Sequence, residues 1–187
     1  MRYRCLITAA ALLALAVPAL AAEVAGVKLE DAADVGGKNL VLNGAGVRTR
    51  LMFKVYVAAL YLPAKAADLP ATLAQSPRRV QMTLLRNVGA DDLVGALVEG
   101  MTANNPAQDM AAVKPQTDQL VTIMKSIGEA KTGDVVALDF VGGETRVGHN
   151  GKTIGTIGGA PFNDALMKIW LGDKPVQADL KKAMLGG

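Results

Sequence analysis

Cysteine is almost absent from this sequence. Its 187 residues include a single cysteine, Cys5, in an N-terminal segment that we expect to be removed. The remaining chain would then have no thiol nucleophile, no disulfide and no cysteine metal ligand. Its stability must come from packing, and a chain of this length with 51% hydrophobic residues can form one compact domain.

Charge of one sign and aromatic residues are also scarce. There are 20 Lys and Arg against 17 Asp and Glu, a formal net charge of +3, and aromatic residues make up 4%. Loss of Arg2 and Arg4 with the N-terminal segment leaves 18 cations against 17 acids, a net charge of +1. A nucleic-acid-binding surface needs a basic stripe with interleaved aromatic rings, so we expect no nucleic-acid partner.

The sequence lacks the common catalytic and nucleotide-binding motifs. It has no Gly-x-Ser-x-Gly and no Gly-x-x-x-x-Gly-Lys-[Ser/Thr], so we expect no cofactor and no metal site. The only histidine, His149, stands beside a predicted turn, where we expect it to face solvent. The glycine-rich segment 155–159 precedes a predicted helix, as a phosphate-binding loop would, but it contains no lysine. It therefore favours close strand-to-helix packing over phosphate binding. Asp91 and Asp92 suit the start of a helix better than a catalytic pair.

The first 21 residues have the pattern of a signal peptide. A basic start at Met1–Arg4 precedes an apolar run from Cys5 to Val17, and Ala19-Leu20-Ala21 fits the small-x-small cleavage rule. The run is shorter than the roughly 20 residues that span a bilayer, and no charged flank follows it, which disfavours the alternative of an uncleaved anchor. We therefore expect a signal peptide at 1–21 and a mature domain at 22–187, secreted across the inner membrane into the periplasm, with no stable membrane anchor after cleavage.

Apolar patterning predicts strands at both ends of the mature chain. The predicted strands cover 24–30, 39–42, 53–62, 78–86, 134–141, 144–149 and 152–157. Gly36-Gly37 is a predicted turn, 43–46 a predicted glycine-rich bend, and Asn150-Gly151 a predicted hairpin turn. Because the run from Phe53 to Leu62 is apolar on both faces, we expect it to lie centrally in a covered sheet.

Helical spacing of apolar residues dominates the middle and the end of the chain. It predicts helices over 91–101, from Pro115 to Gly128, from Pro161 to Gly172, and over 177–185. Strands followed by segregated helices indicate the α+β class.

Three polar side chains lie among apolar residues. Arg48 follows the predicted glycine-rich bend, whereas Tyr56 and Arg86 share the apolar face of their predicted strands. An arginine that points toward an apolar face requires an anion. A ligand carboxylate would supply one, with Tyr56 adding a hydrogen bond and the apolar neighbours accepting an acyl chain. Alternatively, each arginine pairs with an acid of the chain or extends to water. In one straight strand Arg48 and Tyr56 would lie roughly 26 Å apart, so a shared site requires the chain to reverse between Thr49 and Met52.

Four segments together resemble the bacterial chalcone isomerase-like domain. They are Asn43-Gly-Ala-Gly-Val-Arg48, Phe53-Lys-Val-Tyr-Val-Ala-Ala-Leu-Tyr-Leu62, Asn150-Gly-Lys-Thr-Ile-Gly-Thr-Ile157 and Ala165-Leu-Met-Lys-Ile-Trp-Leu-Gly172. The resemblance covers nearly the whole mature chain. It implies an open-faced β-sandwich, in which a helical layer covers a large antiparallel sheet and a ligand cleft lies between them. The family includes plant flavonoid-forming isomerases, plant plastid fatty-acid-binding proteins and non-catalytic relatives, so the fold does not fix the activity.

The resemblance also assigns roles to residues. Arg48 matches the arginine that faces the charged or oxyanionic end of the ligand. Tyr56 stands where plant isomerases have a catalytic threonine and fatty-acid-binding relatives have tyrosine. The isomerases' catalytic tyrosine would fall at Asp92 or Leu93, and neither is a phenol. A polar position early in the last long helix falls at Asn163 or Asp164, where the pattern has Ser or Thr. The candidate ligand-binding residues are Arg48, Tyr56, Arg86 and Asn163.

These residues favour a binding protein over an enzyme. The expected ligand is small and amphipathic, a fatty acid or a flavonoid-like molecule, held between sheet and helices. One alternative is a chalcone or flavonoid isomerase, an intramolecular lyase in which Arg48 and Tyr56 stabilise an oxyanion. Another is a scaffold or partner-binding domain with a filled interior.

Overall fold

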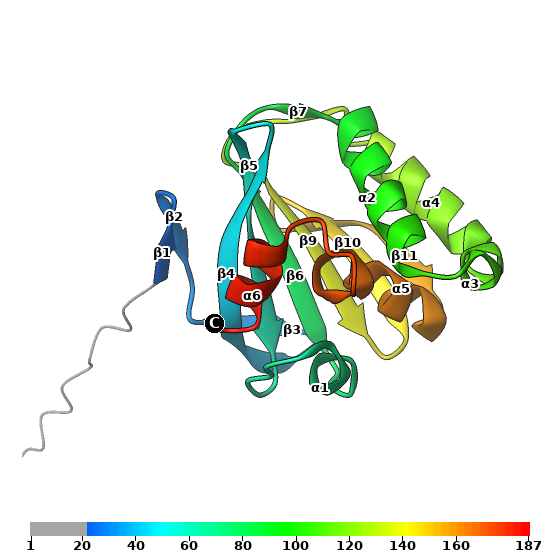
Figure 1. The fold of residues 1–187 in the computed structure, drawn as a ribbon, viewed down its shortest axis with the longest axis horizontal. Helices are drawn as coiled ribbons and strands as arrows, with labels where there is room; N and C mark the ends of the chain where they lie inside the picture. The colour runs from blue at the N-terminus through cyan, green and yellow to red at the C-terminus, as the bar shows by residue number, and fades with distance from the viewer. Residues whose placement is uncertain (1–21) are drawn as a thin grey trace, which may run out of the picture.

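The computed structural model describes residues 22–187, so the predicted signal peptide at 1–21 lies outside the described residues. Its centre is a seven-stranded antiparallel sheet in the order β11-β10-β9-β6-β5-β4-β3 (Figure 1). The strands are β3 (Ala32–Val35), β4 (Lys38–Arg50), β5 (Phe53–Leu62), β6 (Arg78–Leu84), β9 (Val135–Val141), β10 (Glu144–His149) and β11 (Lys152–Gly158). Two further two-stranded sheets pair β1 (Ala22–Val24) with β2 (Val27–Leu29) and β7 (Val88–Gly89) with β8 (Glu129–Ala130).

Helices cover one face of the large sheet (Figure 1). They are α1 (Leu69–Leu73), α2 (Ala90–Asn104), α3 (Ala107–Ala112), α4 (Lys114–Lys125), α5 (Ala160–Leu171) and α6 (Ala178–Met184). α2 packs against both α4 and α5, α4 packs against β11, and α6 packs against β4. Within residues 22–187, no helix has the length and hydropathy needed to cross a membrane.

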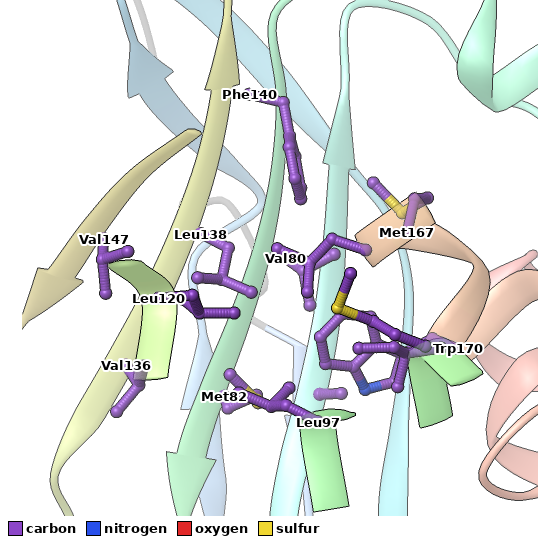
Figure 2. Packing of buried hydrophobic residues seen from close by; sticks show 14 of the residues in the cluster. Val80, Met82, Leu97, Leu120, Val136, Leu138, Phe140, Val147, Met167 and Trp170 are labelled. Atoms are coloured by element: carbon purple, nitrogen blue, oxygen red, sulfur yellow. The ribbon is translucent and has the colours of Figure 1, made fainter. Parts of the chain in front are cut away.

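The sheet separates two apolar clusters because side chains alternate between its faces. The larger cluster lies between sheet and helices. Figure 2 shows part of it, with Val80 and Met82 from β6 near Trp170 from α5. The smaller cluster lies on the other face, where the β1–β2 hairpin contributes Leu29. β5 supplies both clusters, so the prediction of a central strand buried on both sides is confirmed.

The predicted fold class is confirmed: the chain is α+β, with a curled antiparallel sheet and a helical layer. The segment 53–62 matches β5 at both ends, and the four predicted helices correspond to α2, α4, α5 and α6 within a few residues. The short elements α1, α3, β3, β7 and β8 were not predicted, because they carry too few residues to show a period.

The predicted strand over 24–30 is wrong, because this segment is a hairpin. Ala25 and Gly26 both have positive φ angles, 51° and 81°, and they connect β1 to β2. The apolar alternation is real, but a two-residue turn interrupts it.

The predicted bend over 43–46 is also wrong, because these residues lie inside the 13-residue strand β4. The glycines serve close packing there. A Cβ atom added at Gly44 would lie 2.1 Å from the backbone oxygen of Ala183 in α6. Asn43 strengthens the contact, because its buried amide donates to the carbonyl oxygens of Ala66 at 3.0 Å and Met184 at 2.8 Å. The glycine-rich segment therefore seats the C-terminal helix on the sheet.

Candidate functional site

Arg48 and Tyr56 come together across the β4–β5 hairpin. The chain reverses at Leu51 and Met52, within the interval predicted from the sequence, and Arg48 stands directly opposite Tyr56 in the ladder. Residues directly opposite on an antiparallel pair have Cβ atoms about 4.5–5.5 Å apart. The hairpin therefore reduces a separation along the chain to side-chain contact distance.

A β-bulge near the turn sets which residue faces Arg48. The register shifts between Arg48 and Thr49: Thr49 pairs with Lys54, whereas Arg48 pairs with Tyr56, which leaves Val55 as an extra residue on β5. A bulge of this kind redirects the side chains that follow it. Here it places Tyr56 on the helix-facing side of β5, together with the larger apolar cluster.

A cavity of about 670 Å³ lies between this end of the sheet and the helical layer. Its wall residues are Arg48, Arg50, Leu51, Phe53, Val55, Tyr56, Met82, Leu84, Arg86, Asn87, Val88, Gly89, Asp92, Leu93, Ala96, Leu97, Glu99, Gly100, Ala103, Met124, Val136, Ile169, Lys174, Pro175 and Val176. The buried wall residues are mostly apolar, and the charged ones other than Arg48 are exposed and mark the opening. The cleft expected between sheet and helices is therefore present, at a volume typical of small-molecule sites, roughly 300–1,000 Å³.

Among the described residues of the cavity wall, Arg48 is the one half-buried cation. Its Nη1 donates to the Thr49 carbonyl oxygen at 2.5 Å and lies 3.4 Å from Oε1 of Gln177. Within residues 22–187, no carboxylate lies within ion-pair distance of Arg48. Its side-chain partners are the Thr49 carbonyl oxygen, Gln177 and the Tyr56 hydroxyl, which together do not occupy all five N–H donors of the guanidinium. The guanidinium thus presents unused donors at the cavity, and the alternative that it pairs with an acid of the chain does not hold among these residues.

Gln177 fixes the strand segment that carries Arg48. Its Oε1 accepts from the Thr49 backbone N–H at 2.8 Å, and its Nε2 donates to the Val47 carbonyl oxygen at 3.2 Å. Gln177 directly precedes α6, so the docking of α6 on β4 positions this amide. The oxygen and the nitrogen of the Gln177 amide therefore hold the backbone on the two sides of Arg48.

Tyr56 is buried, and its hydroxyl oxygen accepts a hydrogen bond from Nε1 of Trp170 at 3.2 Å. Burial raises the pKa of the Tyr56 phenol, and the hydrogen bond from Trp170 together with the charge and the hydrogen bond of Arg48 oppose this only in part. The phenol is therefore protonated at neutral pH. Because its oxygen already accepts from Trp170, its own O–H remains able to donate to a ligand at the cavity.

Arg86 lies at the opening of the cavity. It follows the end of β6, is exposed, and places its guanidinium 5.0 Å from the centre of the Phe53 ring. The inward position expected from strand parity is therefore not observed, because β6 ends at Leu84, before the alternation reaches Arg86. Arg86 can meet the outer part of a ligand, whereas Arg48 and Tyr56 face the interior.

Asn163 lies away from this cavity. Its side chain is buried at the start of α5, where Oδ1 accepts from the Thr145 hydroxyl at 2.6 Å. It is absent from the cavity wall, so the candidate site contains Arg48, Tyr56 and Arg86 without Asn163. The neighbouring Asp164 pairs with Arg78 at 3.2 Å, so this end of α5 is held by contacts within the protein.

The remaining candidates have structural roles. His149 is only partly exposed, contrary to expectation, because its Nε2 lies 3.2 Å from Oδ2 of Asp134. A Cβ atom at Gly155 would lie 2.4 Å from Cδ1 of Ile123, so this glycine permits the approach of α4 to β11, as predicted. No group of three or more His, Cys, Asp or Glu side chains in residues 22–187 is arranged to hold a metal ion.

Two residues of the site were not recognised in the sequence. Gln177 had no signal, because its contact with Arg48 crosses 129 residues of chain. Trp170 was assigned only to the apolar face of a helix. A buried indole N–H needs an acceptor, and Tyr56 is the phenol that shares the helix-facing cluster with it.

The comparisons with known proteins agree with this architecture. One solved structure with a similar fold is the Arabidopsis thaliana fatty-acid binding protein AtFAP1, at a TM-score of 0.64 and 10% sequence identity, with 86% of this chain and 92% of that chain covered. No curated protein matches the sequence. The family model described as chalcone isomerase-like matches residues 21–186. The chain therefore belongs to the chalcone isomerase-like family.

Proposed function

We propose that this protein is a non-catalytic binding protein for an amphipathic carboxylate such as a fatty acid. The carboxylate would meet Arg48 and the Tyr56 hydroxyl, and the alkyl chain would extend along the apolar wall toward Met82 and Leu97. The observation that carries the proposal is the half-buried guanidinium of Arg48, which faces the cavity with unused donors and, within residues 22–187, no carboxylate partner.

The chemistry of the two side chains favours a carboxylate head group. A guanidinium presents a planar fork of N–H donors that matches the two carboxylate oxygens. Gln177 and the Thr49 carbonyl oxygen already hold one edge of that fork, so part of the ordering cost of ligand binding is met in the free protein. A carboxylate would also satisfy the donors that are otherwise partly removed from water.

The length of the apolar wall favours a ligand with a hydrocarbon tail. Between Arg48 and the far side of the cavity, the wall includes buried side chains from β6, α2, α4 and α5. The name of AtFAP1 states that a protein of this fold binds fatty acids, which supports the same ligand class here.

We also propose that the protein is secreted and acts in the periplasm, on the signal-peptide pattern of residues 1–21. The test is the intact mass of the protein recovered from the periplasmic fraction of a Gram-negative host that expresses the full chain. A mass that begins at Ala22 supports export and cleavage, whereas full-length protein retained in the cytoplasm contradicts them.

The test of the ligand class has two arms. The purified protein is extracted with organic solvent, and the extract is analysed by mass spectrometry for stoichiometric fatty acid. The delipidated protein is then titrated with palmitate and with methyl palmitate, which keeps the tail and removes the charge. We expect palmitate to bind and the ester to bind much more weakly. Equal binding of the two would contradict the carboxylate site, and binding of neither would favour a scaffold.

An isomerase remains a second candidate on one observation: the guanidinium of Arg48 and the hydroxyl of Tyr56 stand at one point and could stabilise an oxyanion. Against it, the two positions that match the isomerases' tyrosine hold Asp92 and Leu93, which are carboxylate and apolar. Absorbance of a chalcone incubated with the protein tests this activity. We expect no faster ring closure than with the Arg48→Ala variant.

A further inference from the structure

The turn between β4 and β5 exposes three consecutive large apolar side chains, Leu51, Met52 and Phe53, which we call the hairpin tip. Their exposed fractions are 82%, 95% and 60%. Among residues 22–187 these are the large hydrophobic side chains that are exposed. In Figure 1 the turn stands at one end of the long β4–β5 ribbon. Contiguous exposed apolar side chains mark interaction sites more often than single ones do.

The residues of this turn are also unfavourable for its backbone. Within residues 22–187, five hairpins have two-residue turns with positive φ at both central positions. The pairs are Ala25-Gly26, Gly36-Gly37, Leu51-Met52, Gly142-Gly143 and Asn150-Gly151. Four of the five have glycine second, as this turn type prefers. Leu51 and Met52, at 47° and 68°, therefore adopt a backbone conformation that their residue types disfavour, and their side chains are not buried in return.

Cations flank the hairpin tip. Arg50 precedes it and Lys54 follows it, both exposed, and the Arg86 guanidinium lies 5.0 Å from the Phe53 ring centre. The sequence between Asp34 and Asp68 contains no acidic residue. The acids that line the same opening, Asp92 and Glu99, belong to α2 and not to the hairpin. An apolar tip between cations is complementary to a bilayer surface with anionic head groups.

The hairpin tip is continuous with the opening of the cavity. Leu51 and Phe53 form part of the cavity wall, as do Arg50 and Arg86. A surface that contacts the tip would therefore cover one edge of the opening. Three side chains on a turn are too few for a stable protein dimer, which buries about 800 Å² per partner, whereas a few apolar side chains suffice for reversible contact with a lipid interface.

We infer that the hairpin tip docks on a lipid bilayer that contains anionic lipids, with Leu51 and Met52 entering the interface and Arg50, Lys54 and Arg86 contacting head groups. This contact places the cavity opening against the lipid. The docking does not depend on which ligand the cavity holds, so its test is separate from the palmitate titration.

The test is flotation of the purified protein with phosphatidylcholine vesicles prepared with and without phosphatidylglycerol. All proteins are expressed from the full chain, and their intact masses establish that they share one N-terminus. The variant L51N/M52G installs the preferred Asn-Gly turn, so we expect its melting temperature to equal or exceed that of the wild type. We expect its binding to vesicles with phosphatidylglycerol to fall by about tenfold or more.

A charge variant and a matched control complete the experiment. R50Q/K54Q should weaken binding to the anionic vesicles, and the residual binding, which keeps the contact of Arg86, should depend less on salt than that of the wild type. K28Q/K38Q removes the same charge from exposed lysines on β2 and at the opposite end of β4, and should bind as the wild type does. Wild-type protein that stays free of anionic vesicles would overturn the inference, as would L51N/M52G protein that floats equally well. Self-association that light scattering detects in the wild type and not in L51N/M52G would assign the tip to a second copy instead, and would also overturn it.

Discussion

Arg48 and Tyr56 face each other across the β4–β5 ladder because one extra residue, Val55, shifts the register beside the turn. Without that shift Arg48 would stand opposite Val55, and the phenol would not share its position in the ladder. The turn at Leu51-Met52, which lacks the glycine and asparagine typical of such turns, and the adjacent bulge at Val55 together create the polar end of the cavity. We make four predictions, three on this site and the contacts that support it and one on the hydrogen bonds of Asp134.

The first concerns Arg48. Its replacement by alanine removes charge-assisted hydrogen bonds, so we expect carboxylate affinity to fall by about 1.5–3 kcal/mol, roughly ten- to a hundredfold in Kd. Isothermal titration with palmitate measures this. Arg146→Ala is the matched control, because that arginine pairs with Glu144 on β10, outside the cavity wall. Equal affinities for the two variants would remove Arg48 from the site.

The second concerns Tyr56 and Trp170. Tyr56→Phe removes the acceptor of a buried indole N–H, so we expect the free energy of unfolding to fall by about 1–3 kcal/mol and palmitate to bind more weakly. Urea denaturation and titration measure the two effects. Tyr61→Phe also loses a hydrogen bond, to the Glu30 carbonyl oxygen, but on the opposite face of the sheet. The Tyr61→Phe variant should lower stability and leave palmitate affinity unchanged. If it lowered palmitate affinity as much as Tyr56→Phe does, the effect of Tyr56 on binding would come from lost stability and not from contact with the ligand.

The third concerns Gly44. Alanine at this position would place a Cβ atom 2.1 Å from the Ala183 backbone oxygen, so α6 must move away from β4. We expect a loss of about 1–3 kcal/mol in the free energy of unfolding, together with weaker palmitate binding because Gln177 moves with α6. Gly95→Ala is the control, since open space surrounds that helical glycine, and it should gain up to about 1 kcal/mol. Thermal unfolding of the two variants compares them directly.

The fourth concerns the acid dependence of stability. Hydrogen bonds from the Asn150 side chain, the Lys131 backbone N–H and His149 lower the pKa of Asp134 from 3.8 to about 2. The folded state thus binds fewer protons than the unfolded state, and the stabilisation is present above about pH 4 and is lost as the pH falls toward about 2. The difference in unfolding free energy between wild type and Asp134→Asn should therefore shrink between about pH 5 and about pH 2. A constant difference across that range would contradict the assignment.

Local patterns predicted much of the fold. β5 and the Asn150-Gly151 turn follow from continuous apolar residues and from a preferred turn pair, which act over a few neighbouring residues. The glycines at 43–46 led to the wrong prediction of a bend for a physical reason. Glycine permits either a turn or the close approach of another backbone, and here it permits the close approach of α6.

The site was predictable only in part. Arg48 and Tyr56 could be selected because polar groups among apolar ones require partners. Their meeting depended on a turn at Leu51 and Met52, whose side chains give no turn signal. Trp170 and Gln177 reach the site from far along the chain, and no local pattern encodes such contacts.

The hydrogen bonds that Gln177 makes to Arg48 and to the backbone on either side of it have a consequence for the order in which this protein folds. A chain that leaves the ribosome, or crosses a membrane from its N-terminus, delivers Arg48 long before the segment that holds it. Until Gln177 and α6 have emerged and packed against β4, the guanidinium lacks one of its two supports, so Arg48 reaches its place in the cavity wall late in folding.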